Sequence, residues 1–139
     1  MTYGTIYLSG PMNTTEDESL FGVVAEKLKV HGLETRNPAG VEWGTTEFAQ
    51  LPAEGMRVGM TELAQCESIF LMGEWRNARG CIAEVFMSAL IGAKIYELDL
   101  GELLDNDVVR AREVDINRYN ASDMVIYLLS QQASFLQEG

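Results

Sequence analysis

The residue whose type and position most clearly suggest chemistry is Glu84. It is the only charged side chain between Gly80 and Ala93, in a stretch that reads GCIAEVFMSALIGA. A carboxylate in apolar surroundings loses its hydration, so it needs a partner or serves a function. Carboxylates in active sites can act as nucleophiles that form a covalent intermediate. Glu84 is therefore the candidate catalytic residue of this chain.

The residues before Glu84 form a local plan that is common in α/β active sites. The apolar run SIFLMG, residues 68–73, predicts a buried strand, and GEWRNARG, residues 73–80, predicts a polar loop. A helix then begins, and Glu84 lies one turn into it. Ligands of α/β proteins bind beyond the carboxyl ends of such strands. The candidate binding residues of this segment are Trp75, Arg76, Arg79 and Gly80.

Two further predicted strands should deliver residues to the same edge of a sheet. The run TIYLS, residues 5–9, stops at a Gly-Pro breaker pair, and a weaker strand at residues 33–36 is closed by NPAG, residues 37–40. The loop that follows, residues 41–52, carries a tryptophan. The candidate binding residues of these segments are Tyr7, Ser9, Gly10, Pro11, Met12, Asn37, Pro38 and Trp43.

Strands and helices alternate along most of the chain. Helices are expected at about residues 15–30, 53–65 and 80–91, and strands at 5–9, 33–36, 68–72 and 94–98. Strands joined by helices imply right-handed crossovers and a parallel sheet. The sequence thus predicts one domain, residues 1–139, built as a three-layer α/β sandwich with a Rossmann-like or flavodoxin-like sheet. Residues 99–139 depart from this rhythm and form a C-terminal extension with an expected helix near Ser122, which could serve oligomerisation.

The helical wheel of residues 80–91 places Glu84 opposite the apolar stripe. The stripe consists of Ile82, Val85, Phe86, Ala89 and Leu90. Glu84 lies about 160–170° from its centre, so the stripe should pack on the sheet while Glu84 points away. Two interpretations are open: a solvated helix residue, or a residue covered by a loop or a second subunit. The second is favoured by the apolar residues on the same side, Ala83, Met87 and Ile91.

The composition restricts the possible partners. A net charge of −11 and a pI of about 4.4 argue against binding of nucleic-acid polymers, which requires a basic face. A mononucleotide is still compatible with this charge, because a local arginine cluster can hold it. No run of about 18 apolar residues could span a membrane, and no signal pattern precedes residue 10.

The cysteines and the single histidine bear on redox compartment and metals. Cys66 and Cys81 lie in apolar contexts and are expected to be reduced core thiols of a cytoplasmic protein. His31 is the one histidine, and no Cys/His cluster accompanies it. A zinc site is therefore not expected, and neither is a cofactor.

Four motifs, in order, resemble the nucleoside 2-deoxyribosyltransferase-like superfamily, most of all its small, often phage-encoded branch. They are IYLSGPM at residues 6–12, RNPAG at 36–40, W-x-x-x-x-G-x-x-x-E ending at Glu84, and ALIGAKIY at 89–96. The resemblance covers about residues 5–98. It implies the parallel-sheet fold predicted above and cleavage of the N-glycosidic bond of a 2-deoxynucleoside or its 5′-phosphate.

The resemblance also implies roles for individual residues. Glu84 would attack C1′ as the base leaves, and water or a second base would then resolve the sugar–enzyme ester, as in retaining glycosidases. The helix start near Gly80, with Arg76 and Arg79, suits a phosphate. Trp43, Trp75 or Tyr7 could stack on a base. Alternatively, the arginines pair with surface acids and the tryptophans belong to the core.

The sequence departs from the family pattern at two helper positions. The family usually has Ser or Asp two residues before the glycine, at the sugar 5′ end or its phosphate, where this chain has Ala78. It often has a proton-transferring Asp at the position of Gly59, eight residues before the acid that opens the third strand. That acid is Glu67 here instead of Asp, and Glu62 or Glu74 could take over the proton role.

Three classes of function therefore remain open from the sequence. The first is a nucleotide hydrolase or deoxyribosyltransferase, and the second is a catalytically degenerate nucleotide binder, such as a sensor or sequestering protein. The third is an assembly protein that uses the fold for contacts. In each case a homo-oligomer, at least a dimer, is expected, because the side of the 80–91 helix around Glu84 and the segment at 124–129 carry much apolar surface. The family resemblance agrees, since its members typically borrow a residue from a neighbouring subunit. Alternatively, residues 99–139 fold back over the helix within one chain.

Overall fold

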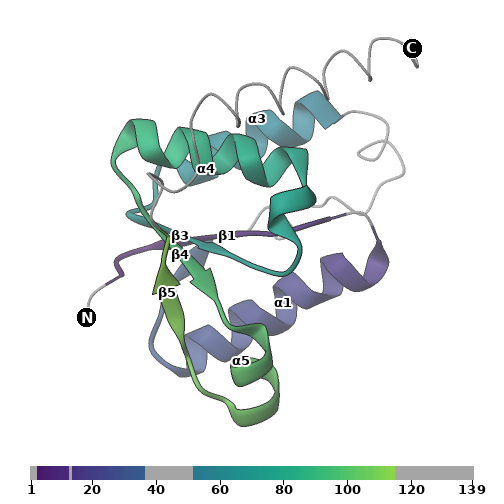
Figure 1. Cartoon of the computed structure of the whole chain (residues 1–139), viewed down its shortest axis with the longest axis vertical. Helices are drawn as coiled ribbons and strands as arrows, with labels where there is room; N and C mark the ends of the chain where they lie inside the picture. The colour runs from purple at the N-terminus through teal and green to yellow at the C-terminus, as the bar shows by residue number, and fades with distance from the viewer. Residues whose placement is uncertain (1–2, 13, 37–51, 115–139) are drawn as a thin grey trace.

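The described part of the chain forms a five-stranded sheet with helices on both faces (Figure 1). The computed structural model describes residues 3–12, 14–36 and 52–114. In the helix at residues 52–63, side chains are described from residue 57 onward. The elements are β1 (Ile6–Ser9), α1 (Thr15–Val30), β2 (Thr35–Arg36), α3 (Pro52–Leu63), β3 (Ser68–Leu71), η2 (Trp75–Asn77), α4 (Arg79–Ile91), β4 (Lys94–Leu98), α5 (Leu100–Asn106) and β5 (Ala111–Glu113).

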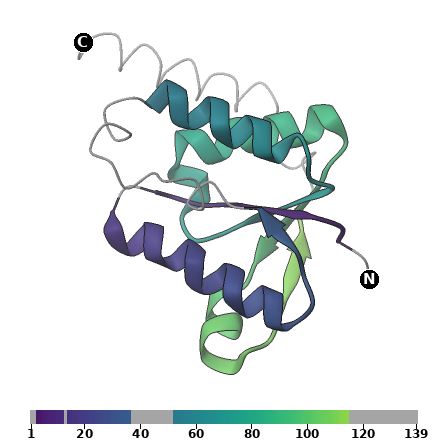
Figure 2. The same cartoon turned by 180° about the vertical axis from the view of Figure 1, so that it is seen from behind.

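The strand order is β2-β1-β3-β4-β5, and strands β2, β1, β3 and β4 run parallel to one another. The α/β three-layer prediction is confirmed: α3 and α4 cover one face of the sheet, and α1 and α5 cover the other (Figures 1 and 2). The chain leaves β1 for β2 on one side and returns to β3 on the other. Ligand sites of such sheets lie at the carboxyl ends of the two strands where the order reverses, which here are β1 and β3.

Alternation along the strands divides the core into two clusters. One parity faces α3 and α4 and contributes Tyr7, Ile69, Leu71 and Ile95. The other parity faces α1 and α5 and contributes Ile6, Leu8, Phe70, Met72, Tyr96 and Leu98. Buried residues at both parities explain why strands β1 and β3 read as continuous apolar runs. Polar residues on the first parity, such as Ser9, therefore project beneath α3 and α4.

A capping box formed by Thr14 and Asp17 fixes the start of helix α1. Thr14 caps the helix with its side chain, which accepts from the Asp17 backbone N–H, while the Asp17 carboxylate accepts from the Thr14 backbone N–H. This reciprocal pair satisfies two N–H groups that the helix leaves unpaired. The predicted helix start is therefore correct to within the first turn.

The segment after β4 differs from the βα alternation that precedes it. Asp99 caps the short helix α5, and the chain then returns as β5, antiparallel to β4 at the edge of the sheet. This strand was not predicted from the sequence. Residues 115–139 lie outside the described part, so the predicted C-terminal helix and its proposed role in oligomerisation stay predictions. Among the described residues, no helix is long and apolar enough to cross a membrane.

Candidate functional site

Glu84 points toward the sheet, so the prediction that it points away was wrong, whereas Ile82 and Val85 of the predicted stripe do pack in the core. Its side chain is 8% exposed, and it accepts hydrogen bonds from the hydroxyls of Tyr7 and Ser9 on β1. Leu90, which the helical wheel placed toward the sheet, is 74% exposed. The inward face of α4 instead consists of Cys81, Ile82, Glu84, Val85 and Ser88.

The reason for this orientation lies in partners that the hydropathy of α4 does not reveal. The hydroxyls of Tyr7 and Ser9 satisfy both oxygens of the Glu84 carboxylate, with Ser9 Oγ 2.8 Å from Oε1 and the Tyr7 hydroxyl on Oε2. Ser88 is fully buried and donates to the Glu84 backbone carbonyl at 2.8 Å. Because buried polar groups are stable where they are hydrogen-bonded, this polar stripe can face inward.

Burial makes the Glu84 carboxyl a group that titrates near neutrality. Desolvation raises its pKa from 4.5 to about 7, and the hydrogen bonds from Tyr7 and Ser9 partly oppose that rise. Desolvation, together with the Glu84 charge, also raises the pKa of Tyr7, so its hydroxyl stays a donor. A buried carboxyl whose pKa lies close to working pH is typical of catalytic acids, bases and nucleophiles.

A buried thiol adjoins this pair. Desolvation raises the pKa of Cys81 to about 12, a rise that a hydrogen bond with Ser9 opposes and the nearby Glu84 charge reinforces. Cys81 and Cys66 are both buried and unbridged, as the sequence predicted. Because the thiolate is the reactive form, Cys81 acts here as a neutral neighbour of Ser9.

Close backbone approaches hold the loops after β1 and β3 together at the reversal of strand order. A Cβ at Gly10 would lie 3.3 Å from the Met72 carbonyl oxygen, and Gly73 has a φ of +60°, which favours glycine. Pro11 lies next to Gly73. The predicted segment from Ser9 to Met12 therefore does meet the start of the β3–α4 loop, and Glu84 lies beside Ser9.

A second cluster gathers around Glu97 on β4. Its carboxylate accepts from Trp75 Nε1 at 2.8 Å and pairs with Arg76 and Arg112 at 2.8 Å each. The Arg76 guanidinium also stacks 4.5 Å from the centre of the Trp75 ring. Although partial burial alone would raise the pKa of Glu97, the Trp75 hydrogen bond and the two arginines lower it. Glu97 is thus held ionised, in contrast to Glu84.

A surface hollow of about 280 Å³ adjoins this second cluster at the carboxyl ends of β3 and β4. Its lining residues are Gly73, Arg76, Glu97, Leu98, Asp99 and Leu100. In the sheet register Ser9 pairs with Leu71, and Leu71 with Glu97. Two strand spacings therefore separate Ser9 from Glu97, roughly 10 Å. Glu84 does not line this hollow. We nevertheless place the candidate site at Glu84, because it is the buried carboxyl whose pKa lies near neutrality.

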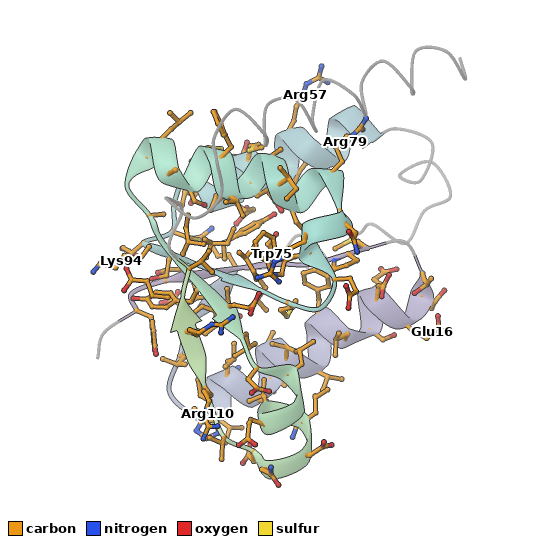
Figure 3. The ribbon with its side chains drawn as sticks, in the orientation of Figure 1. Glu16, Arg57, Trp75, Arg79, Lys94 and Arg110 are labelled. Atoms are coloured by element: carbon orange, nitrogen blue, oxygen red, sulfur yellow. The ribbon has the colours of Figure 1, made fainter. Side chains whose placement is uncertain are left out.

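The predicted binding residues separate into three groups. Ser9 donates to Glu84, Gly10 and Pro11 lie beside Met72 and Gly73 at the ends of β1 and β3, and Met12 packs against the core cluster on the opposite face of the sheet. Arg79 and Gly80 begin α4, and Arg76 pairs with Glu97. Tyr7 and Trp75 are buried, at 0% and 2% exposure, and Trp75 lies between the sheet and α4 (Figure 3). Both are therefore core residues in this structure and do not present a face for stacking on a base. Asn37, Pro38 and Trp43 lie outside the described residues.

Two features of the site escaped the sequence analysis. Glu97 could have been predicted as a site residue, because the alternation of side chains in KIYEL places it on the same face of the sheet as Ile95, next to Leu71 of β3. Gly59 was noted as a missing helper, but its contact with the Tyr7–Glu84 pair depends on how α3 packs, which no local pattern encodes. Within the described segments, no group of three or more His, Cys, Asp or Glu side chains could hold a metal ion.

Comparison with solved structures identifies the class of fold. The chain is similar to the 2-deoxyribosyltransferase of the psychrotolerant bacterium Bacillus psychrosaccharolyticus, with a TM-score of 0.53 and 18% identity over 86% of this chain and 95% of the other. At this identity the likeness concerns the fold. The sequence belongs to a family described as a domain of unknown function, DUF4406, which matches residues 4–97. No curated protein matches the sequence significantly.

Proposed function

We propose that this protein binds a nucleoside or nucleotide and cleaves or transfers its N-glycosidic bond, with Glu84 as the nucleophile. The observation that carries the proposal is the placement of one buried carboxylate, oriented by Tyr7 and Ser9, at the reversal of strand order. The similar fold of a 2-deoxyribosyltransferase supports it, and so do the motifs around residues 6–12 and 75–84.

The reaction follows from the two oxygens of the carboxylate. The ionised Glu84 carboxylate attacks C1′ of the sugar, the C1′–N bond breaks, and the base leaves with the bonding electrons and takes up a proton from water. Water or a second base then attacks C1′ and releases the carboxylate. Tyr7 and Ser9 hold the carboxylate in one orientation throughout, which reduces the cost of reaching attack geometry.

A second candidate is a nucleotide-binding protein without turnover. Two observations favour it: Glu84 is only 8% exposed, and Gly59 brings no acid side chain to the site. Incubation with a panel of 2-deoxynucleosides and their 5′-phosphates, with free base measured by chromatography, separates the two. Released base supports the enzyme, whereas thermal stabilisation by a nucleotide without released base supports the binder.

The anionic end of a ligand should depend on the arginines of the β3–α4 loop. Arg76 is paired with Glu97, but its departure would leave Glu97 with Trp75 and Arg112 as donors. The cost of turning Arg76 toward a phosphate should therefore be small. Because a hydrogen bond to a charged group contributes about 1.5–3 kcal/mol, we expect Arg76→Ala with Arg79→Ala to weaken nucleotide binding roughly 10- to 100-fold.

The nucleoside is the internal reference for this prediction. Its affinity, measured by calorimetry, should change little in the double variant, since it has no phosphate. Arg110→Ala is the matched control, because Arg110 is 65% exposed and lies near α5, away from α4 (Figure 3). Equal weakening of nucleoside and nucleotide would contradict a role of the arginines in anion binding.

We also propose that the protein forms a homodimer through the outer side of α4. Leu90 and Ile91 are 74% and 46% exposed there, and burying side chains of this size contributes roughly 1.5–3 kcal/mol each. Light scattering at micromolar concentration should give the mass of a dimer, and Leu90→Lys should reduce it to that of a monomer. Val30→Lys, at an equally exposed site on α1, should leave the mass unchanged. A monomeric wild-type protein would refute this proposal.

A further inference from the structure

Helix α3 approaches the Tyr7–Glu84 pair at a single glycine. Gly59 is buried in the interior of α3. A Cβ at this position would lie 2.8 Å from the Tyr7 hydroxyl oxygen and 3.0 Å from Glu84 Oε2. These separations are shorter than van der Waals contact, so a methyl group does not fit unless the pair or the helix moves.

The atoms that such a methyl would meet have little freedom to move. Tyr7 is fully buried in the cluster that includes Leu63, Ile69 and Leu71, and its hydroxyl is at the end of a rigid ring. Glu84 is fixed by the hydroxyls of Tyr7 and Ser9. An added side chain would therefore either break the Tyr7–Glu84 hydrogen bond or lift α3 from the sheet.

Glycine at this position is unfavourable for the helix itself. Glycine destabilises a helix interior relative to alanine. Gly22, in the interior of α1, offers an internal comparison, since a Cβ there would meet nothing within 4 Å. Both glycines therefore lie in a helix interior, but only at Gly59 would an added Cβ meet other side chains.

We propose that Gly59 is a positioning residue for Glu84: its missing side chain lets the backbone of α3 close over the carboxylate and keeps the Tyr7 hydroxyl on Oε2. The importance of this for turnover rests on the proposed function. The closure itself does not, because it can be measured in the protein without substrate. The same contact leaves no room at residue 59 for any side chain that would take part in proton transfer.

The first test compares stability in four variants. Gly22→Ala should raise Tm by about 3 °C, since it gains helix propensity without a clash, whereas Gly59→Ala should lower Tm. In the Tyr7→Phe background the nearest obstacle is removed, and the ring atom Cζ lies 4.0 Å from the new methyl. Glu84 Oε2 is still 3.0 Å away, but it is the end of a flexible side chain that the Tyr7 hydroxyl no longer holds. Gly59→Ala should therefore cost less, or nothing, in that background. If Gly59→Ala does not fold, the double variant with Tyr7→Phe should fold.

The second test follows the ionisation of Glu84 by carboxyl carbon NMR. Burial is the main cause of its raised pKa and the Tyr7 hydrogen bond opposes it, so lifting α3 should admit water and lower that pKa from about 7, whereas displacing the Tyr7 hydroxyl should raise it. The titration of Glu84 should therefore shift in Gly59→Ala, but not in Gly22→Ala. If base release is observed, kcat should fall about 100-fold in Gly59→Ala because of the misplaced carboxylate, with KM little changed. A wild type that releases no base would refute the proposed function and leave both tests above intact.

Three results would overturn the inference. The first is that Gly59→Ala stabilises the wild type as Gly22→Ala does. The second is an unchanged Glu84 titration in Gly59→Ala. The third is failure of both Gly59→Ala and its Tyr7→Phe double variant to fold, because the hydroxyl would then not be the obstacle.

Discussion

Glu84→Gln is expected to abolish base release and, at the same time, to stabilise the folded protein at pH 8. The amide keeps the shape of the carboxyl and can still pair with Tyr7 and Ser9, but it cannot act as the nucleophile. Loss of a nucleophile typically costs about 10⁴-fold or more in kcat. The variant gains stability because the buried site disfavours the negative charge of the Glu84 carboxylate, and glutamine carries no charge.

The sign of the stability effect follows from the pKa of Glu84. Because burial raises that pKa from 4.5 to about 7, the folded state binds the proton more tightly than the unfolded state. The stabilising contribution of the protonated form is complete below pH 4.5, decreases as pH rises from 4.5 to 7, and is lost above 7. The ionised carboxylate then costs on the order of 3 kcal/mol, which the neutral glutamine avoids.

Urea denaturation at pH 4 and pH 8 measures this difference. The variant should exceed the wild type in stability at pH 8 by a few kcal/mol, and the two should nearly coincide at pH 4, where Glu84 is protonated. Glu26→Gln, which makes the same charge change at an exposed position of α1, should show no comparable gain. A variant that is less stable than the wild type at pH 8, or that retains full base release, would refute the role assigned to Glu84.

The sequence determined the fold through features that are local. The apolar runs at residues 6–9 and 68–71 are buried on both faces, so they could be recognised as central parallel strands. The start of α1 was predicted near residue 15, where Thr14 and Asp17 form the capping pair, and Gly92, in the left-handed conformation, marks the end of α4. The isolation of Glu84 in its helix likewise indicated a buried carboxylate without any structural information.

The orientation of Glu84 could not be predicted for a physical reason. A helical wheel weighs side chains by hydrophobicity, and it therefore placed Leu90 inward and Glu84 outward. The hydroxyls that satisfy Glu84 come from Tyr7 and Ser9, more than seventy residues earlier in the chain. Only the tertiary pairing of α4 with β1 makes the inward orientation favourable, and the approach of α3 at Gly59 depends on the same packing.

The buried cluster around Glu84 and the partly exposed cluster around Glu97 give the carboxyl ends of the strands an electrostatic asymmetry. Glu84 has two hydroxyl donors and a pKa raised by burial, whereas Glu97 has an indole and two arginines and a lowered pKa. Environments that separate the pKa values of two carboxyls assign them different roles. The Glu84 carboxyl can gain or lose its proton near neutral pH. Glu97 stays ionised and holds the β3–α4 loop through Trp75 and Arg76.

Tyr7→Phe is expected to shift the pH dependence of base release to higher pH. The variant keeps the ring in the core but removes the hydroxyl that donates to Glu84 Oε2. This hydrogen bond lowers the pKa of Glu84 against the effect of burial, so its loss should raise that pKa above 7. A hydrogen bond to a charged group is worth about 1.5–3 kcal/mol, which corresponds to a rise of roughly 1–2 pH units.

The pH–rate profile of kcat distinguishes this effect from simple damage to the fold. At pH 7 base release should fall roughly 5- to 50-fold, because fewer molecules carry the ionised nucleophile, and raising the pH to 9 should recover most of the loss. Tyr96→Phe removes a hydroxyl from the opposite face of the sheet, where Tyr96 packs against Phe70, and should leave the profile in place. A Tyr7→Phe profile with the midpoint of the wild type would mean that the hydroxyl does not control the ionisation of Glu84.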